Sequence, residues 1–235
     1  HILMSPPNSD KFPFVAVPDA DNCCVQGWAD IATRLRQAIS RHASKKVVVV
    51  VDCYTGVNEA SVVQGLQSRL SPALALRAED AMLDSEQIDE LVAPFLGEND
   101  PVFGFLSGLT LPQFFDQEKL LKIRAQVAAI PEGLVLVVGC GASLVAEPDI
   151  LIYADLARWE AQLRYRRNEA SNLGVENRTL AASLQYKRAF FVDWRVCDRW
   201  KRPLIAKWDF VLDTHIPDKP KLAEGDAIRR GLRHA

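Results

Sequence analysis

The fold is decided by the stretch KKVVVVVDCYTGVNEASVVQGL, residues 45–66. Its five consecutive valines are too few for a helix, and uninterrupted β-branched runs of this kind are typical of strands buried on both faces of a parallel sheet. The run ends at Asp52, a turn follows around Gly56, and Val62 and Leu66 then recur at helical spacing. The stretch therefore predicts a strand, a tight turn and a helix, which together begin an α/β unit.

The same alternation continues on both sides of this stretch. We therefore predict an α/β three-layer sandwich with a mainly parallel sheet and right-handed crossovers. Residues 1–22 are expected to form an irregular arm that opens with a tag remnant, and residues 23–235 a single domain. Helical spacing marks residues 27–42, 58–70, 84–95, 117–127, 156–167 and 183–201, and further strands are expected in ALALRAED, GLVLVVGCGASLV, DILIYAD and WDFVLDT.

The composition is that of a globular protein from a reducing compartment. With 235 residues, 49% of them apolar, and a formal charge of -2, the chain is long enough to bury one substantial core. It has no apolar run of about 18 residues and no basic-then-apolar leader, so we expect a cytoplasmic protein without a membrane span or signal peptide. The five cysteines and four histidines lack the spacings of zinc sites or disulfide frameworks, and no metal site is expected.

Positive charge is concentrated late in the chain. Between residues 155 and 207, 12 Lys or Arg stand against 6 Asp or Glu. This local excess predicts that the segment meets an anion. Nucleic acid is not expected as that anion, because the whole chain is slightly negative and carries no recognisable nucleic-acid-binding motif.

The turn after the first strand has the outline of a phosphate-binding loop. The P-loop pattern G-x-x-x-x-G-K-[ST] supplies a lysine for the terminal phosphates and a hydroxyl for magnesium. With Gly56 as the second glycine, the first glycine, the lysine and the hydroxyl are replaced by Val51, Val57 and Asn58. Two interpretations stay open: a phosphate site that has lost its charge, or a plain strand, turn and Asn-capped helix in an α/β core.

The later part of the chain resembles a known family. The run YADLARWEAQLRYRRNEASNLG, followed by SLQYKRAFFVDWRVCDRWKRPLIAKWDFVLDTH, is similar in order and spacing to the C-terminal part of uridine-kinase-like P-loop kinases. In those enzymes an arginine-rich helix and lid precede a tyrosine-containing helix that ends in a proline, and then a final strand bearing an aspartate. The resemblance covers residues 45–214. It implies a P-loop-kinase-like sandwich with a basic, helical, lid-like segment at about 156–207.

A second resemblance is narrower. LVAPFLGENDPVFGFLSGLTLPQFFD, SLQYKRAFFVDWRVCDRWKRPL and DFVLDTHIPDKPKLAEGDAIRRGL look like the N-terminal kinase-like domain of bacterial proteins that continue into a cupin of the class I mannose-6-phosphate isomerase type. Those domains carry an Asp-x-Tyr-x-Gly-Val turn in place of a working Walker lysine, matched here by Asp52, Tyr54, Gly56 and Val57. The cupin and its zinc-binding histidines are absent from this chain. The resemblance implies a cupin-type isomerase domain or subunit as a partner.

The residues and the resemblances together single out a candidate site. Asp52 is a tentative catalytic carboxylate, and Glu79 and Asp80 fall where related kinases hold substrate or magnesium. Structural roles stay open for all of these residues. Asp52 could cap the turn, and Glu79 and Asp80 could simply lie at the surface. The basic residues named below could form a solvated face or salt bridges to Asp193 and Asp198. Guanidinium forks suit phosphate oxygens. The residues expected to bind phosphate or another anion are Tyr54, Thr55, Gly56, Val57, Asn58, Arg164, Arg166, Arg167, Lys187, Arg188 and Arg195.

Three functions are consistent with these patterns. Loss of the P-loop lysine and hydroxyl removes much of the transition-state stabilisation, so efficient phosphoryl transfer is not expected. The leading hypothesis is a degenerate nucleoside or sugar kinase-like domain that binds a phosphorylated sugar, a nucleotide or another anion and assists sugar-phosphate metabolism, with no certain cofactor. The first alternative is an active kinase that uses ATP, magnesium and the lid arginines. The second is a structural module for homo-oligomerisation or docking, which predicts a large exposed apolar patch.

Overall fold

The computed structural model describes residues 14–98 and 100–234. The arm predicted over residues 1–22 therefore lies partly outside the described residues, and residues 14–23 contain turns and bends but no helix or strand. Within the described ranges, no helix combines the length and the apolar character needed to cross a membrane.

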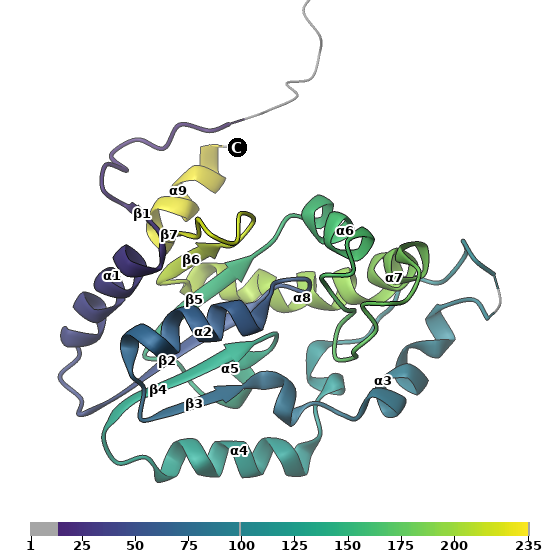
Figure 1. The fold of residues 1–235 in the computed structure, drawn as a ribbon, viewed down its shortest axis with the longest axis horizontal. Coiled ribbons are helices and arrows are strands. Elements are labelled where there is room, and N and C mark those ends of the chain that lie inside the picture. The colour runs from purple at the N-terminus through teal and green to yellow at the C-terminus, as the bar shows by residue number, and fades with distance from the viewer. Residues whose placement is uncertain (1–13, 99, 235) are drawn as a thin grey trace, which may run out of the picture.

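A seven-stranded sheet forms the centre of the molecule (Figure 1). In spatial order the strands are β1-β7-β6-β5-β2-β4-β3. Neighbours from β6 to β3 are parallel, while β7 is antiparallel to both β6 and β1. The predicted α/β class with a mainly parallel sheet is thus confirmed. The strands are β1 Cys24–Gln26, β2 Lys46–Cys53, β3 Leu74–Arg77, β4 Gly133–Gly139, β5 Ile150–Asp155, β6 Phe210–Asp213 and β7 Lys221–Glu224.

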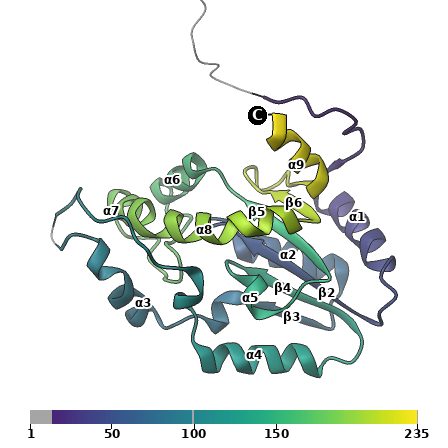
Figure 2. The same ribbon diagram turned by 180° about the vertical axis from the view of Figure 1, so that it is seen from behind.

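Helices cover both faces of this sheet. Figure 1 shows α1 and α2 over one face, and Figure 2 shows α5 and α8 over the other. The helices α3, α6 and α7 lie beyond the ends of the strands (Figure 1). The helices are α1 Trp28–Ser40, α2 Glu59–Leu70, α3 Ser85–Val92, α4 Gln117–Ala129, α5 Ala142–Val145, α6 Arg158–Arg166, α7 Ala182–Arg188, α8 Trp194–Leu204 and α9 Gly225–His234.

The valine run behaves as its composition predicts. β2 lies between β4 and β5, with Val49 aligned to Leu136 on one side and Ile150 on the other. Val49, Val50 and Val51 are completely buried, because helices cover both faces of the central strand. At the end of β2, the side chain of Asn58 accepts a hydrogen bond from the N–H of Ser61 at 3.0 Å and caps α2.

Three segments differ from the sequence prediction. The helix predicted over 183–201 is α7, a π-helical turn Ala189–Asp193 and then α8. GLVLVVGCGASLV contains the predicted strand, which ends at Gly139, and also the short helix α5, which was not predicted. The strands β1 and β7 and the helix α9 were not predicted, because three- or four-residue strands carry too little periodicity to be recognised.

Candidate functional site

A cavity of about 920 Å³ opens beside the carboxyl ends of β2, β3 and β4. We call it the strand-end cavity. Its walls come from residues 55–60 after β2, from Arg77 to Ser85 around and after the end of β3, from Cys140 after β4, and from the loop 169–178. Ligands of open α/β sheets bind at this edge, because the loops that follow parallel strands meet there. The cavity is therefore the candidate functional site.

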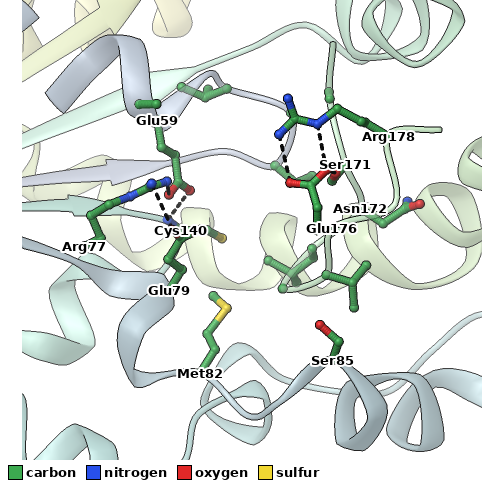
Figure 3. Close-up of a pocket in the computed structure, with 18 of the residues that line it drawn as sticks. Glu59, Arg77, Glu79, Met82, Ser85, Cys140, Ser171, Asn172, Glu176 and Arg178 are labelled. Carbon is green, nitrogen blue, oxygen red and sulfur yellow. Dashed lines mark hydrogen bonds and ion pairs between the residues drawn. The ribbon is translucent and has the colours of Figure 1, made fainter. Parts of the chain in front are cut away.

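Glu59, the first residue of α2, lies in one wall of the strand-end cavity (Figure 3). Its carboxylate accepts a hydrogen bond from the N–H of Cys140 at 2.9 Å and lies 3.7 Å from the guanidinium of Arg77. Arg77 also forms an ion pair with Glu79 at 2.9 Å. Burial raises the pKa of Glu59 to about 7, with the negative charges of Glu79 and Asp52 acting in the same direction. A carboxyl that titrates near neutrality in a cavity is a candidate acid, base or ligand-binding group.

The loop 169–178 forms the opposite wall (Figure 3). Glu176 accepts hydrogen bonds from Arg178 at 2.6 and 2.8 Å and from the hydroxyl of Ser171 at 3.0 Å. The hydrogen bonds from Arg178 are the largest cause of a lowered pKa of Glu176, about 2. The side chain of Asn172 donates to Asp193 at 2.7 Å, and this contact ties the loop to the π-helical turn. The wall is thus held by polar contacts within the loop and beneath it.

The cavity carries more carboxylates than cations. Each of its cations is paired: Arg77 with Glu79, Lys119 with Asp84 at 2.6 Å, and Arg178 with Glu176. A polyanion would meet net negative charge here, whereas carboxylates accept hydrogen bonds from hydroxyl groups. Its six acidic residues are Glu59, Glu79, Asp80, Asp84, Glu169 and Glu176, and its three basic residues are Arg77, Lys119 and Arg178.

The turn predicted to bind phosphate borders this cavity through Thr55, Gly56, Val57 and Asn58, but Tyr54 does not line it. Gly56 has φ +91°, a conformation that favours glycine. A Cβ atom at Gly56 would lie 3.2 Å from side-chain atoms of both Leu156 and Ala161. The start of α6 therefore packs against the turn and leaves little room for a phosphate on that side.

Arg164, predicted to bind an anion, instead holds this turn in place. Its guanidinium donates to the carbonyl oxygen of Gly56 at 3.0 Å and to that of Thr214 at 2.8 Å, and it pairs with Glu160 at 3.2 Å. The side chain is only 5% exposed. Arg167, the neighbour on the same helical segment, pairs with Glu160 at 2.8 Å and with Glu169 at 2.9 Å.

The other predicted cations are dispersed. Lys187 donates to the carbonyl oxygen of Asp100, and Arg188 pairs with Asp89 at 2.7 Å. Arg166 lies over the ring of Trp159, and Arg195 over that of Phe190. None of the six predicted basic residues lines the strand-end cavity. The structure therefore does not bring the turn and the predicted lid cations together at one anion site. Carboxylates, carbonyl oxygens and aromatic rings within the protein contact these cations instead.

Asp52 is completely buried at the end of β2. Its carboxylate accepts hydrogen bonds from the N–H of Gly141 at 3.1 Å, the N–H of Ser143 at 3.0 Å and the indole N–H of Trp200 at 3.0 Å. Burial raises the pKa of Asp52 above its ordinary value. These contacts fix the turn after β4 to the central strand, which is a structural role. The catalytic role of Asp52 stays a prediction, and the buried position of its carboxylate does not support it.

Glu79 and Asp80, which were predicted from the sequence to lie on the substrate side, both line the cavity. The sequence reasoning missed Glu59 and the loop 169–178. An acidic residue directly after the Asn cap was the available signal for Glu59, yet its burial depends on the distant turn at Cys140. Among residues 14–98 and 100–234, no group of three His, Cys, Asp or Glu side chains is arranged to hold a metal ion.

Comparison with known proteins adds a family. The model of a family described as "Domain of unknown function (DUF8485)" matches residues 27–235. The chain belongs to this family. This DUF8485 domain is also similar to a solved structure, the "putative fructose transport system kinase from Silicibacter sp. TM1040", with 13% identity, a TM-score of 0.49, and 74% of this chain and 94% of that chain covered. The search of curated proteins found no match. The narrower resemblance to isomerase-type proteins stays a prediction.

The raised pKa of Glu59 predicts that the DUF8485 domain loses stability as the pH rises. The folded state keeps the proton up to a pKa of about 7, against an ordinary value of 4.5, so it binds more protons than the unfolded chain between these values. Stability should fall across that window, by at most about 3.5 kcal/mol at about 1.4 kcal/mol per pKa unit. We expect Glu59→Gln to lack this loss, measured by urea unfolding at about pH 5 and about pH 7.5.

The matched control is Glu118→Gln, which neutralises an exposed carboxylate on α4 outside the cavity. Its unfolding free energy should follow the unaltered chain at every pH. Parallel pH curves for Glu59→Gln and the unaltered chain would contradict the assignment of a near-neutral pKa to Glu59.

Proposed function

We propose that this DUF8485 domain binds a hydroxyl-rich small molecule of the sugar or nucleoside class in the strand-end cavity, and that it serves sugar-phosphate metabolism as an accessory domain. The observation that carries the proposal is Glu59, a largely buried carboxyl with a pKa of about 7 at the base of a polar cavity. The sequence resemblance to kinase-like domains of isomerase-type proteins supports the metabolic setting.

The chemistry of the cavity supports a neutral ligand with many hydroxyl groups. Glu59, Glu79 and Asp80 offer acceptor oxygens on one side, and the hydroxyl of Ser171 lines the other. The apolar residues Met82, Leu173 and Val175 also line the cavity and suit the less polar face of a sugar ring or a base. The volume of about 920 Å³ is within the range of small-molecule sites.

The charges of the cavity count against a phosphorylated ligand. Arg77, Lys119 and Arg178 are all engaged by carboxylates, so a phosphate would have to displace existing ion pairs. Phosphoryl transfer also depends on cations that neutralise the moving group. The turn at Gly56 has no lysine and lies against α6, so an active kinase is the weaker alternative. Docking of a cupin-type isomerase domain is compatible with this proposal and independent of it.

The test is thermal stabilisation by a ligand panel, since a ligand that binds only the folded state raises the melting temperature. The panel contains mannose, fructose, ribose and uridine, their phosphates, Mg-ATP and sulfate. We expect a neutral member to stabilise the domain by about 2.7 kcal/mol at a concentration of 100 times its Kd. Glu59→Ala should weaken this binding at least about tenfold, because a hydrogen bond to a charged group contributes about 1.5–3 kcal/mol.

Glu118→Ala, which truncates an exposed acid outside the cavity, should leave the binding unchanged. Stabilisation by Mg-ATP or by phosphates alone would contradict the proposal and favour the kinase or anion-binding alternatives. No stabilisation by any compound would also contradict it and would leave a structural module as the better explanation.

A further inference from the structure

A second cavity, of about 690 Å³, is lined by residues of α6, α7, the π-helical turn and the segment 101–103. We call it the aromatic cavity, because Phe103, Tyr186, Phe190 and Phe191 line it together with Val102. It shares no lining residue with the strand-end cavity. A mostly apolar cavity of this volume with a few polar groups is the usual form of a small-molecule site.

The wall that carries Val102 and Phe103 is held in place by polar contacts. The carboxylate of Asp100 accepts hydrogen bonds from the N–H groups of both residues at 2.7 Å, and these bonds lower its pKa. The carbonyl oxygen of Asp100 accepts a hydrogen bond from the ammonium group of Lys187. The turn is thereby attached to α7 across the cavity.

The continuation of this wall approaches the helices closely. The N–H of Ser107 donates to the carbonyl oxygen of Phe191 at 2.8 Å. A Cβ atom at Gly104 would lie 2.7 Å from the ring of Phe191 and 2.6 Å from the carbonyl oxygen of Phe95. Only glycine fits between these groups, so the segment follows a defined path along the helices.

Several large apolar side chains around this cavity are exposed to solvent. Phe103 is 73% exposed, Val102 68%, Tyr186 40% and Phe190 36%. Contiguous exposed apolar groups of this kind mark interaction sites. The patch is what the docking alternative predicted from the sequence, but here its side chains surround a concave space.

Arg166 gives the cavity a charge preference. It lines the cavity and makes no hydrogen bond or ion pair with any residue that the structure describes. Its guanidinium lies over the ring of Trp159, 5.9 Å from the ring centre. The other lining cation, Lys187, is held by the carbonyl oxygen of Asp100. Two cationic side chains therefore line an aromatic, apolar interior, and Arg166 is the one whose donors are free to pair with a ligand.

We propose that the aromatic cavity binds an amphipathic monoanion: a molecule with an aromatic or branched aliphatic body and one carboxylate-type charge. The body lies against Phe103, Tyr186 and Phe190, and the charge pairs with Arg166. The free donors of Arg166 suit one carboxylate-type group, the ammonium of Lys187 adds positive charge nearby, and the apolar interior favours a largely hydrocarbon body. This site is independent of the proposed function of the strand-end cavity.

The probes are two dyes with similar aromatic bodies. 8-Anilinonaphthalene-1-sulfonate carries one negative charge, and N-phenyl-1-naphthylamine carries none. We expect saturable binding of both dyes in fluorescence titrations of the folded domain. Arg166→Gln should weaken binding of the anionic dye about fivefold, as expected for an exposed ion pair, and leave the neutral dye unchanged. Phe190→Ala should weaken both dyes about tenfold through lost apolar contact.

The matched control is Arg202→Gln, which removes an exposed charge outside the cavity and should change neither titration. The proposal is overturned if neither dye shows saturable binding, or if Arg166→Gln affects both dyes equally. It is also overturned if sedimentation shows a dimer that Phe190→Ala dissociates, because the face would then be an interface between copies of the chain. Competition by 4-phenylbutyrate but not by 4-phenylbutanol would support the charge preference.

Discussion

Replacing Asp193 with alanine should lower the free energy of unfolding by about 3–5 kcal/mol, the cost of removing one partner from a buried ion pair. Asp193 has no exposed surface, and it accepts hydrogen bonds from the side chain of Asn172 at 2.7 Å and the N–H of Leu173 at 3.3 Å. The guanidinium of Arg188, itself only 7% exposed, lies 3.6 Å away. Alanine would leave the side chain of Asn172 and the N–H of Leu173 without this acceptor, and the guanidinium of Arg188 without this carboxylate.

The same change should loosen one wall of the strand-end cavity. Asn172 and Leu173 belong to the loop 169–178, so hydrogen exchange in that loop should accelerate more than in α2. The control is Asp89→Ala, which removes the other carboxylate of Arg188 from a position that is 64% exposed and should cost less than about 1 kcal/mol. Equal losses in urea unfolding for the two variants would contradict the central role of Asp193.

Asp52→Ala should cost at least about 3 kcal/mol, because it leaves three buried or partly buried donors without their acceptor at about 1–3 kcal/mol each. Those donors belong to Gly141, Ser143 and Trp200. Asp52→Asn keeps one acceptor oxygen and should lose about half as much. Both values can be measured by urea unfolding.

The pair of Asp52 variants also tests the catalytic alternative. If Asp52 holds the turn after β4, the loss of ligand binding should follow the loss of stability in both variants. A catalytic carboxylate would behave differently: Asp52→Asn would abolish turnover of a phosphoryl acceptor while the unfolding free energy stayed close to that of the unaltered chain. That result would restore the role predicted from the sequence.

The features that the sequence predicted well rest on local signals. The valine run of β2, the Asn58 cap and the helices on either side depend on neighbouring residues, and the structure contains them. The parallel sheet followed from their alternation. The position of Glu79 and Asp80 in the lining of the cavity was also predictable, because residues that follow a strand lie at the sheet edge where ligands bind.

The features that the sequence did not predict depend on distant partners. Arg164 donates to Gly56, 108 positions away, and this contact turns a candidate phosphate ligand into a structural group. Glu59 gains its pKa of about 7 from burial against the turn that contains Cys140, 81 positions away. The sequence does contain an excess of basic residues between residues 155 and 207. It could not show which carboxylates and carbonyl oxygens would compensate that positive charge.

The pairing of β1 with β7 has a consequence for how the chain is made. Residues 24–26 are synthesised before the five parallel strands, but their strand partners at residues 221–223 are synthesised only after them. At about 5–20 residues per second, β1 waits on the order of ten seconds or more before its hydrogen bonds can form. The five parallel strands can assemble during that time, since all of them precede β7. This edge of the sheet is therefore completed after the parallel strands, and β6, already paired with β5, keeps its other edge unpaired until β7 has been synthesised.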